Sequence, residues 1–152
     1  MSLESAQSPG EHGCMTETHS VGSAPVSTVT GDPVARVAAD ATVADAAKAL
    51  VAHEVGVVVV GDEERPTAVL SERDVVRVVA AGNDPATTRV TDVASTKLVR
   101  SSPDATVDEV ALTMMEHYIR HVLVEQDGVL VGIVSARDLL GVYSSTAGPV
   151  AE

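Results

Sequence analysis

The sequence has no Phe, no Trp and only two Tyr, so the apolar core of this 152-residue chain must consist of Val, Ala, Leu, Ile and Met. Its single cysteine, Cys14, excludes an internal disulfide and favours a reducing compartment. The apolar runs are short, Val57 to Val60 being an example, and cannot cross a bilayer. The N-terminus lacks the basic start and the apolar stretch of a secretory signal. We therefore expect a cytoplasmic protein that has no membrane partner.

Positive charge is also scarce, because 10 Lys and Arg face 22 Asp and Glu and the formal net charge is -12. Binding a nucleic-acid backbone requires clustered cations that release counterions, so no nucleic acid is expected as a partner. A single nucleotide requires only local positive potential and backbone donors, and the net charge does not exclude it. The acidity otherwise serves solubility.

The chain contains an ungapped internal repeat. When the sequence is displaced by 64 residues, positions 40–76 align with positions 104–140, and 11 of these 37 positions are identical. The identities include the polar residues His53, Ser71, Arg73 and Asp74, and many other positions exchange one apolar residue for another. Because polar identities are kept, we interpret the match as a duplication. Two copies indicate a paired module rather than a solenoid.

The repeat divides the chain into five parts. Residues 1–25 are rich in Ser, Gly, Thr and Glu and lack an apolar period, so they are predicted to be a disordered tail. Repeat 1 covers 26–84, a linker covers 85–89, repeat 2 covers 90–144, and 145–152 form a second tail. The Asp-Pro pair at 84–85 marks the start of the linker.

Each copy predicts the order β-α-β-β-α, an α+β fold. Thr42 and Thr106 are placed to cap the first helices, with Asp45 and Glu109 completing capping boxes. The helices run to about 54 and 118, and the second helices end at Gly82 or Gly141. The predicted strands are 34–37, 55–60 and 67–70 in the first copy and 97–101, 121–125 and 129–134 in the second. One such unit is too small to bury both faces of its sheet, so the copies should pack on each other.

Ser71 with Asp74, and Ser135 with Asp138, follow a strand and open a helix in each copy. The S-x-x-D spacing is that of a capping box, and capping alone explains it. The alternative is that both helix mouths hold a phosphorylated ligand, with the hydroxyl donating to phosphate and the carboxylate accepting from a ribose diol. Both copies also keep an Arg, Arg73 or Arg137, which capping does not require. This favours the ligand interpretation.

With its D-x-T-V helix start and its closing GIVSARD at 132–138, the repeat resembles the CBS domain, a module named after cystathionine β-synthase. The second copy carries the pattern nearly whole and the first is looser. The resemblance implies a tandem pair about a pseudo-two-fold axis with two clefts, which in this family often bind AMP, ADP, ATP or S-adenosylmethionine. It assigns sugar and phosphate contacts to Ser71 and Asp74 in one cleft and to Ser135 and Asp138 in the other.

The resemblance implies further ligand contacts. Arg120 and His121 match a basic pair expected to face phosphate. The remaining predicted contacts, around the base and beside the phosphates, are Val34, Arg36, Val58, Arg73, Leu98, Val99, Arg100, Val122 and Arg137. In the first copy Gly56 and Val57 replace the basic pair, and Ala68 replaces the Gly of the final motif. We therefore expect the cleft of Ser135 and Asp138 to be the better site.

No metal site is expected. His117 and His121 have the spacing of a helical metal pair, but the helix should end near Tyr118, which breaks that geometry. The sequence shows no activated nucleophile and no Gly-rich cofactor loop, so neither an enzyme nor a catalytic cofactor is expected.

Three hypotheses from different classes remain for the function. The first is a regulatory sensor that binds an adenosine-containing ligand, forms a homodimer and signals to a separate, unidentified effector protein. The second is a ligand-free structural or adaptor dimer that acts through its surface. An enzyme that turns over ATP is a third and weaker hypothesis.

Overall fold

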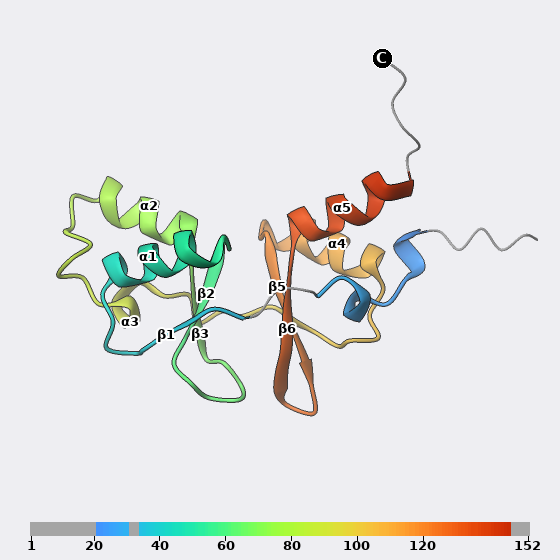
Figure 1. The fold of residues 1–152 in the computed structure, drawn as a ribbon, viewed down its shortest axis with the longest axis horizontal. Helices are drawn as coiled ribbons and strands as arrows, with labels where there is room; N and C mark the ends of the chain where they lie inside the picture. The colour runs from blue at the N-terminus through green and yellow to red at the C-terminus, as the bar shows by residue number, and fades with distance from the viewer. Residues whose placement is uncertain (1–20, 31–33, 147–152) are drawn as a thin grey trace, which may run out of the picture.

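The computed structural model describes residues 21–30 and 34–146 and contains two three-stranded sheets, each accompanied by helices (Figure 1). The first repeat contains β1 (Arg36–Val37), α1 (Val43–His53), β2 (Val57–Val60), β3 (Ala68–Ser71) and α2 (Glu72–Ala80). The second contains β4 (Arg100–Ser101), α4 (Val107–His117), β5 (His121–Gln126), β6 (Val129–Ser135) and α5 (Ala136–Thr146). Short helices α3 (Val90–Val93), η1 (Val21–Ser23) and η2 (Val26–Thr28) precede the repeats. The predicted β-α-β-β-α order is confirmed in both copies.

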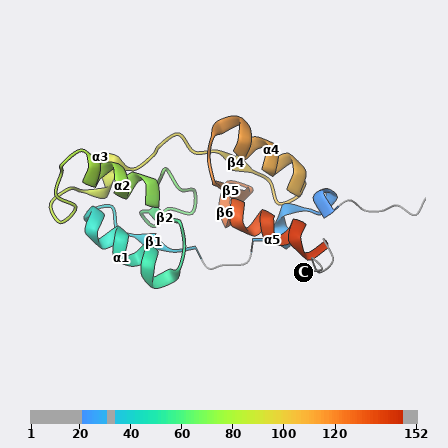
Figure 2. The same cartoon turned by 90° about the horizontal axis from the view of Figure 1, so that it is seen from above.

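The two sheets have the same topology. In the order β1-β2-β3, β1 pairs parallel with β2 through the α1 crossover, and β2 pairs antiparallel with β3 in a hairpin. The order β4-β5-β6 repeats this arrangement, with a bulge between Val124 and Glu125. The two hairpins lie side by side at the centre, and Figure 2 shows α1, α2, α4 and α5 spread over one side of the molecule.

The first helix of each repeat begins at the predicted capping box. Thr42 Oγ1 accepts from the Asp45 N–H at 3.2 Å, and Thr106 Oγ1 accepts from the Glu109 N–H at 3.1 Å. The return bond from the Thr42 N–H is the main reason that the pKa of Asp45 lies below its usual value. Both helices end at a residue in the left-handed region, Glu54 and Tyr118, each with φ of 53°.

Each repeat has its own aliphatic core, as the composition predicts. The first core includes Val58, Val60 and Leu70, and the second includes Val122, Val124 and Val134. Strand residues of this kind are buried because the helices cover one face of each sheet. No polar or charged residue in the described part of the chain is buried.

The segment before the first strand of each repeat packs in the core of the other repeat. Val26 is fully buried in the second core, where its N–H donates to Ala105 at 2.7 Å. Val90 is fully buried in the first core, where its N–H donates to Ala41 at 3.0 Å. At the 64-residue offset Val26 corresponds to Val90, and Ala41 corresponds to Ala105. The duplicated unit therefore includes the segment that packs in the other repeat.

Two predictions are wrong, namely the disorder of residues 21–25 and the end of the last helix at Gly141. Residues 21–25 are ordered because η1 and its neighbours pack on the second repeat, and Val26 and Val29 pack in the same core. The segment predicted to be the linker contacts the first repeat, since the carbonyls of Pro85 and Thr88 accept from the first turn of α1. Helix α5 continues past Gly141 to Thr146 because Val142 packs on the second core. Residues 1–20 and 147–152 of the predicted tails lie outside the described residues.

Candidate functional site

Two clefts lie between the repeats, with volumes of about 410 and 420 Å³. We name them the Ser135 cleft and the Ser71 cleft after the helix mouth that each contains. The Ser135 cleft is lined by residues 34–35, 54–57, 72, 120–121, 133 and 135–138. The Ser71 cleft is lined by residues 56–57, 69, 71–74, 77, 95, 97–99, 117–121 and 123. Each cleft therefore takes residues from both repeats.

The helix mouths form reciprocal capping bonds. The Ser135 N–H donates to Asp138 Oδ2 at 2.8 Å, and the Asp138 N–H donates to Ser135 Oγ at 3.1 Å. In the other cleft, the Ser71 N–H and hydroxyl both donate to Asp74 Oδ2 at 2.9 Å, and the Asp74 N–H donates back at 3.3 Å. The capping interpretation is thus confirmed. It is compatible with ligand binding, since capping occupies Oδ2 of each carboxylate and both mouths line a cleft.

The segment before the first strand of each repeat lines the cleft that contains the helix mouth of the other repeat. Val34 and Ala35 of the first repeat line the Ser135 cleft, whereas Leu98 and Val99 of the second line the Ser71 cleft. These segments precede the short strands β1 and β4, which begin later than predicted. A ligand in either cleft would consequently touch both repeats, which is the geometry needed to couple occupancy to their packing.

Arg120 and His121 contribute to both clefts, as do Gly56, Val57 and Glu72. The His121 ring lies against Gly56, because a Cβ added to Gly56 would be 2.9 Å from its Cε1 and Nε2 atoms. Gly56 and Val57 occupy the positions equivalent to Arg120 and His121. The absence of a side chain at Gly56 thus leaves the space that the His121 ring occupies.

Burial lowers the pKa of His121 below its usual value, and the nearby Arg120 guanidinium lowers it further. The carboxylates of Glu72 and Asp138 act in the opposite direction and only partly offset this effect. His121 is therefore a neutral imidazole at pH 7, able to donate one hydrogen bond and accept another. Arg120 is the permanent cation of the shared wall.

Four residues predicted to contact ligand lie outside both clefts. Val58 and Val122 are fully buried, because their side chains point from the sheets into the two cores. Arg36 donates to the carbonyls of Gly61 and Glu63 at 3.0 and 3.2 Å, and Arg100 donates to the Pro66 carbonyl at 2.7 Å. Both guanidinium groups therefore hold the hairpin loop at the opposite end of the strands from the helix mouths.

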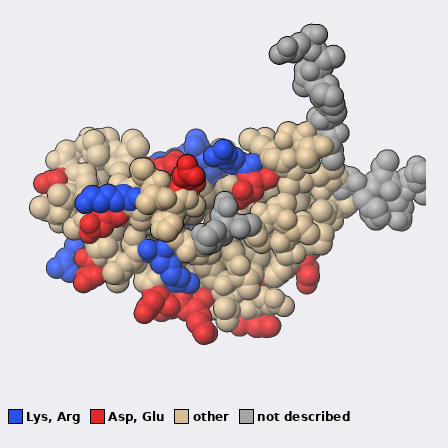
Figure 3. All heavy atoms as spheres, in the orientation of Figure 1, with Lys and Arg blue, Asp and Glu red and all other residues tan. Residues whose placement is uncertain are grey.

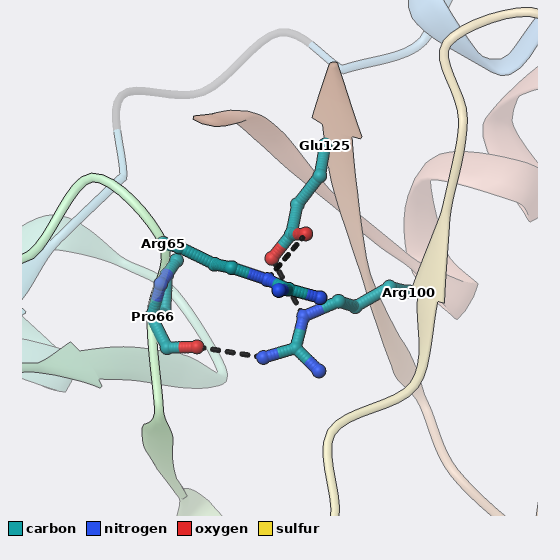
Figure 4. Close-up of polar contacts among 4 residues, drawn as sticks. All are labelled: Arg65, Pro66, Arg100 and Glu125. Atoms are coloured by element: carbon teal, nitrogen blue, oxygen red, sulfur yellow. Dashed lines mark hydrogen bonds and ion pairs between the residues drawn. The ribbon is translucent and has the colours of Figure 1, made fainter. Parts of the chain in front are cut away.

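Arg100 also joins the two repeats. Figure 4 shows its Nε and that of Arg65 approaching the Glu125 carboxylate, at 2.7 and 3.6 Å. The Glu125 side chain is only 9% exposed, so this pairing is less screened than an ordinary surface ion pair. Beside it the Leu130 N–H donates to the Glu64 carbonyl at 2.9 Å. These bonds fix one hairpin against the other and thereby set the spacing of the walls of the clefts.

Sequence reasoning missed several lining residues. His117 and Tyr118 enter the Ser71 cleft where α4 ends, and Glu54 enters the Ser135 cleft where α1 ends. The helix-end position of His117, which the sequence predicts, is confirmed, and its Nδ1 lies 3.0 Å from the Thr113 carbonyl. Lys97 and Arg77 also line the Ser71 cleft. Their only sequence signal is proximity to elements already assigned to a site.

Charge gathers at the junction of the repeats. Figure 3 shows Lys and Arg together with Asp and Glu over the region between the helices of the two halves. No group of three or more potential ligands among the described residues is arranged to hold a metal ion. None of the helices within the described ranges is long and apolar enough to span a membrane.

The CBS domain family model matches residues 21–81 and 90–145, so the chain belongs to the CBS domain family and contains two such domains in tandem. The structure of a CBS-domain-containing protein from Agrobacterium tumefaciens is 30% identical, with a TM-score of 0.74 over 80% of this chain and 94% of that one. A CBS domain protein from Pyrobaculum aerophilum, complexed with AMP, is also 30% identical, with a TM-score of 0.73 over 83% of this chain and 100% of that one.

An uncharacterized protein of Methanopyrus kandleri is 33% identical over 93 residues, which are 59% of this chain and 47% of that protein. The chain thus spans about half the length of this curated relative. The predicted CBS pair is confirmed by the family match and by these folds.

Proposed function

We propose that this protein is a regulatory module that binds an adenosine-containing ligand between its two CBS domains and passes the occupancy of that site to an effector protein. The observation that supports this most directly is the composition of the clefts, since each is lined by a helix mouth of one repeat and a first-strand segment of the other. The AMP-bound Pyrobaculum protein, at 30% identity, supports an adenosine ligand. AMP, ADP, ATP and S-adenosylmethionine are the candidates.

In this proposal the Asp of each helix mouth binds the ribose, and the Ser binds the phosphate of a ligand that carries one. Asp138 Oδ2 accepts the Ser135 N–H, and its Oδ1 would accept from the ribose hydroxyls. The phosphate of a ligand that carries one would lie near the Ser and the first N–H groups of the following helix, with Arg120 supplying positive charge to either cleft. Ligand binding would shift the packing of the repeats only as far as its affinity differs between their arrangements.

A specific observation also favours the adaptor alternative. The Ser and Asp of both helix mouths form complete capping pairs, so their presence in two copies does not by itself require a ligand. In that case the clefts stay empty and the surface performs the function. We propose the sensor because capping explains neither Arg73 nor Arg137, both of which line a cleft.

Thermal unfolding with AMP, ADP, ATP and S-adenosylmethionine tests the sensor proposal. A ligand at 100 times its dissociation constant is expected to raise the free energy of unfolding by about 2.7 kcal/mol. The Asp74→Asn and Asp138→Asn variants are made separately and together, because each retains an acceptor for the cap but loses the charge. We expect the double variant to lose the ligand-induced shift.

The matched control for this experiment is Asp45→Asn, which makes the same change in a capping box outside both clefts. It should lower the basal stability by about 1 kcal/mol or less and keep the full shift. A well-folded protein that none of these compounds stabilises would contradict the sensor proposal and favour the adaptor. We propose no catalytic role, and turnover of ATP that disappears in the double variant would overturn this part.

We propose in addition that the protein forms a homodimer through its helical side. Val51, Val76, Met115 and Leu140 lie on α1, α2, α4 and α5 and are 65–79% exposed. Val51 is equivalent to Met115, and Val76 to Leu140, at the 64-residue offset. The exposed apolar face therefore has the pseudo-two-fold symmetry of the fold. Such a face suits an isologous contact with a second copy.

Light scattering of the purified protein tests the dimer. We expect a mass of twice 15.6 kDa for the wild type. The Val76→Lys/Leu140→Lys variant should be a monomer, because it places charges in the centre of the contact. The control is Val131→Lys, which adds a Lys at a half-exposed apolar position on β6, away from the helices. A monomeric wild type, or a dimer that only Val131→Lys disrupts, would contradict the proposed interface.

A further inference from the structure

The two clefts differ in charge although the duplication made them equivalent. The Ser71 cleft is lined by Arg73, Arg77, Lys97 and Arg120 against Glu72 and Asp74, a formal charge of +2 with His counted as neutral. The Ser135 cleft is lined by two cations, Arg120 and Arg137, against Glu54, Glu72 and Asp138, a formal charge of -1. This difference arises in a protein whose net charge is -12.

The clefts differ by three charges, of which Lys97 supplies one and two substitutions between the copies supply the others. Arg77 in the Ser71 cleft corresponds to Gly141, and Tyr118 corresponds to Glu54 in the other cleft. The first exchange adds a cation to the Ser71 cleft, and the second adds an anion to the Ser135 cleft. The Ser, Arg and Asp of the two helix mouths, by contrast, are identical at the 64-residue offset. Divergence has therefore changed the surroundings of the site and kept its centre.

The positive charge of the Ser71 cleft is available to a ligand. Of its cations, Arg77 forms an ion pair with Asp74 Oδ1, at a loose 3.7 Å, and the Arg77 side chain is 70% exposed. Both Arg73 and Lys97 are exposed residues. A terminal phosphate carries a charge of about -1.5 to -2 at pH 7, and a di- or triphosphate carries more. Such a ligand gains from several converging cations and is repelled by uncompensated carboxylates.

We propose that the Ser71 cleft is the site of a nucleoside di- or triphosphate, and that the Ser135 cleft instead selects an adenosine compound without phosphate charge, such as adenosine or a sulfonium nucleoside. This inference rests on the proposed function and refines it. It reverses the sequence-based expectation that the Ser135 cleft is the better site for a nucleotide. The two CBS domains would then bind two different ligands, one in each cleft.

Calorimetric titration with ATP and with adenosine tests the assignment, using Arg73→Ala and Arg137→Ala as a matched pair. The two residues occupy equivalent positions, one in each cleft, so each substitution removes the same charged group from only one of the two clefts. We expect Arg73→Ala to weaken ATP binding roughly tenfold to a hundredfold, as expected for loss of a charge-assisted bond. Arg137→Ala should leave the affinity for ATP within about twofold.

Lys97→Ala and salt provide independent readouts. Lys97 lines only the Ser71 cleft, so its loss should also weaken ATP binding and leave adenosine unaffected. Raising the ionic strength from about 0.05 to 0.5 M should weaken the binding of ATP much more than that of adenosine. Salt screens the attraction between the cations and the phosphates, and adenosine carries no phosphate. Thermal unfolding without ligand confirms that each variant is folded.

The outcomes separate this inference from the proposed function. If ATP binds and Arg137→Ala weakens it as much as Arg73→Ala or more, the assignment of the clefts is wrong while the sensor proposal stands. If ATP binding is lost in Arg73→Ala and kept in Arg137→Ala, the assignment is supported. If neither ATP nor adenosine nor S-adenosylmethionine binds the folded wild type, both proposals fail.

Discussion

Replacing Val26 with Asp is expected to destabilise the second CBS domain by about 4 kcal/mol or more, although Val26 lies in the part of the chain matched to the first domain. Val26 is fully buried among the core residues of the second repeat, and an unpaired carboxylate there has no compensating partner. Small domains have total stabilities of about 5–15 kcal/mol, so this change brings the second repeat close to unfolding. The milder Val26→Ala should cost about 2 kcal/mol by loss of apolar burial.

Chemical denaturation together with amide hydrogen exchange checks this result. In Val26→Ala, exchange should accelerate first in α4, β5 and β6, whose residues pack around Val26. The equivalent Val90→Ala should accelerate exchange in α1, β2 and β3. Ser27→Ala is the control, because Ser27 lies in the same short helix but is exposed. If Val26→Ala were as silent as Ser27→Ala, or accelerated exchange only in the first repeat, the exchanged packing would be wrong.

A methyl group added at Gly56 is expected to destabilise the protein by about 1–3 kcal/mol and to weaken ligand binding in both clefts. The added Cβ would lie 2.9 Å from two atoms of the His121 ring, a distance that forces one of them to move. Gly56 has no positive φ, so Ala brings no backbone strain, and the cost comes from the collision with the ring. Because Gly56 and His121 line both clefts, displacement of the ring changes both sites.

A double-mutant cycle isolates this collision. His121→Ala removes the ring, so Gly56→Ala should cost little in that background, and the coupling between the two substitutions should be about 1–2 kcal/mol. Denaturant unfolding gives the four stabilities, and calorimetric titration gives the affinity of each variant for its ligand. Gly61→Ala is an unsuitable control because Gly61 has φ of 91°, but Ala86→Gly changes one methyl group at an exposed site. Equal costs of Gly56→Ala with and without His121 would show that the ring is not responsible.

The pattern of the sequence was sufficient to predict the elements and their order. The capping boxes at Thr42 and Thr106 depend on residues close in sequence, as does the hairpin after each first helix. Such local features can be predicted from one sequence. The 64-residue repeat added the pairing of two similar domains. Identification of the helix mouths of Ser71 and Ser135 followed from the same local pattern. Which strand residues face the clefts was predicted less well, since Val58 and Val122 were assigned to the site but are buried in the cores.

Contacts between the repeats were beyond the reach of local patterns. Residues 21–29 pack in the second core and residues 90–94 pack in the first. A repeat search cannot show this, because the two segments align with each other whether each packs in its own repeat or in the other one. Arg100 was predicted to bind ligand, yet it pairs with Glu125 and the Pro66 carbonyl, since the choice between these partners depends on where the hairpin of the first repeat lies. The charge of each cleft was likewise hidden, because Lys97 and Arg77 come from different repeats.

The sequence by itself therefore determined the identity of the modules: a duplicated β-α-β-β-α unit with an S-x-x-D helix mouth in each copy. These features depend on hydrogen bonds and periodicities that span only a few residues. The tertiary structure alone decided which segments meet across the pseudo-two-fold axis. It placed His121 on Gly56, combined Val34 with Ser135 and Leu98 with Ser71, and gave the two clefts opposite charge. The physical reason is that packing and electrostatic potential are summed over neighbours in space, whereas the order of the chain specifies neighbours in sequence.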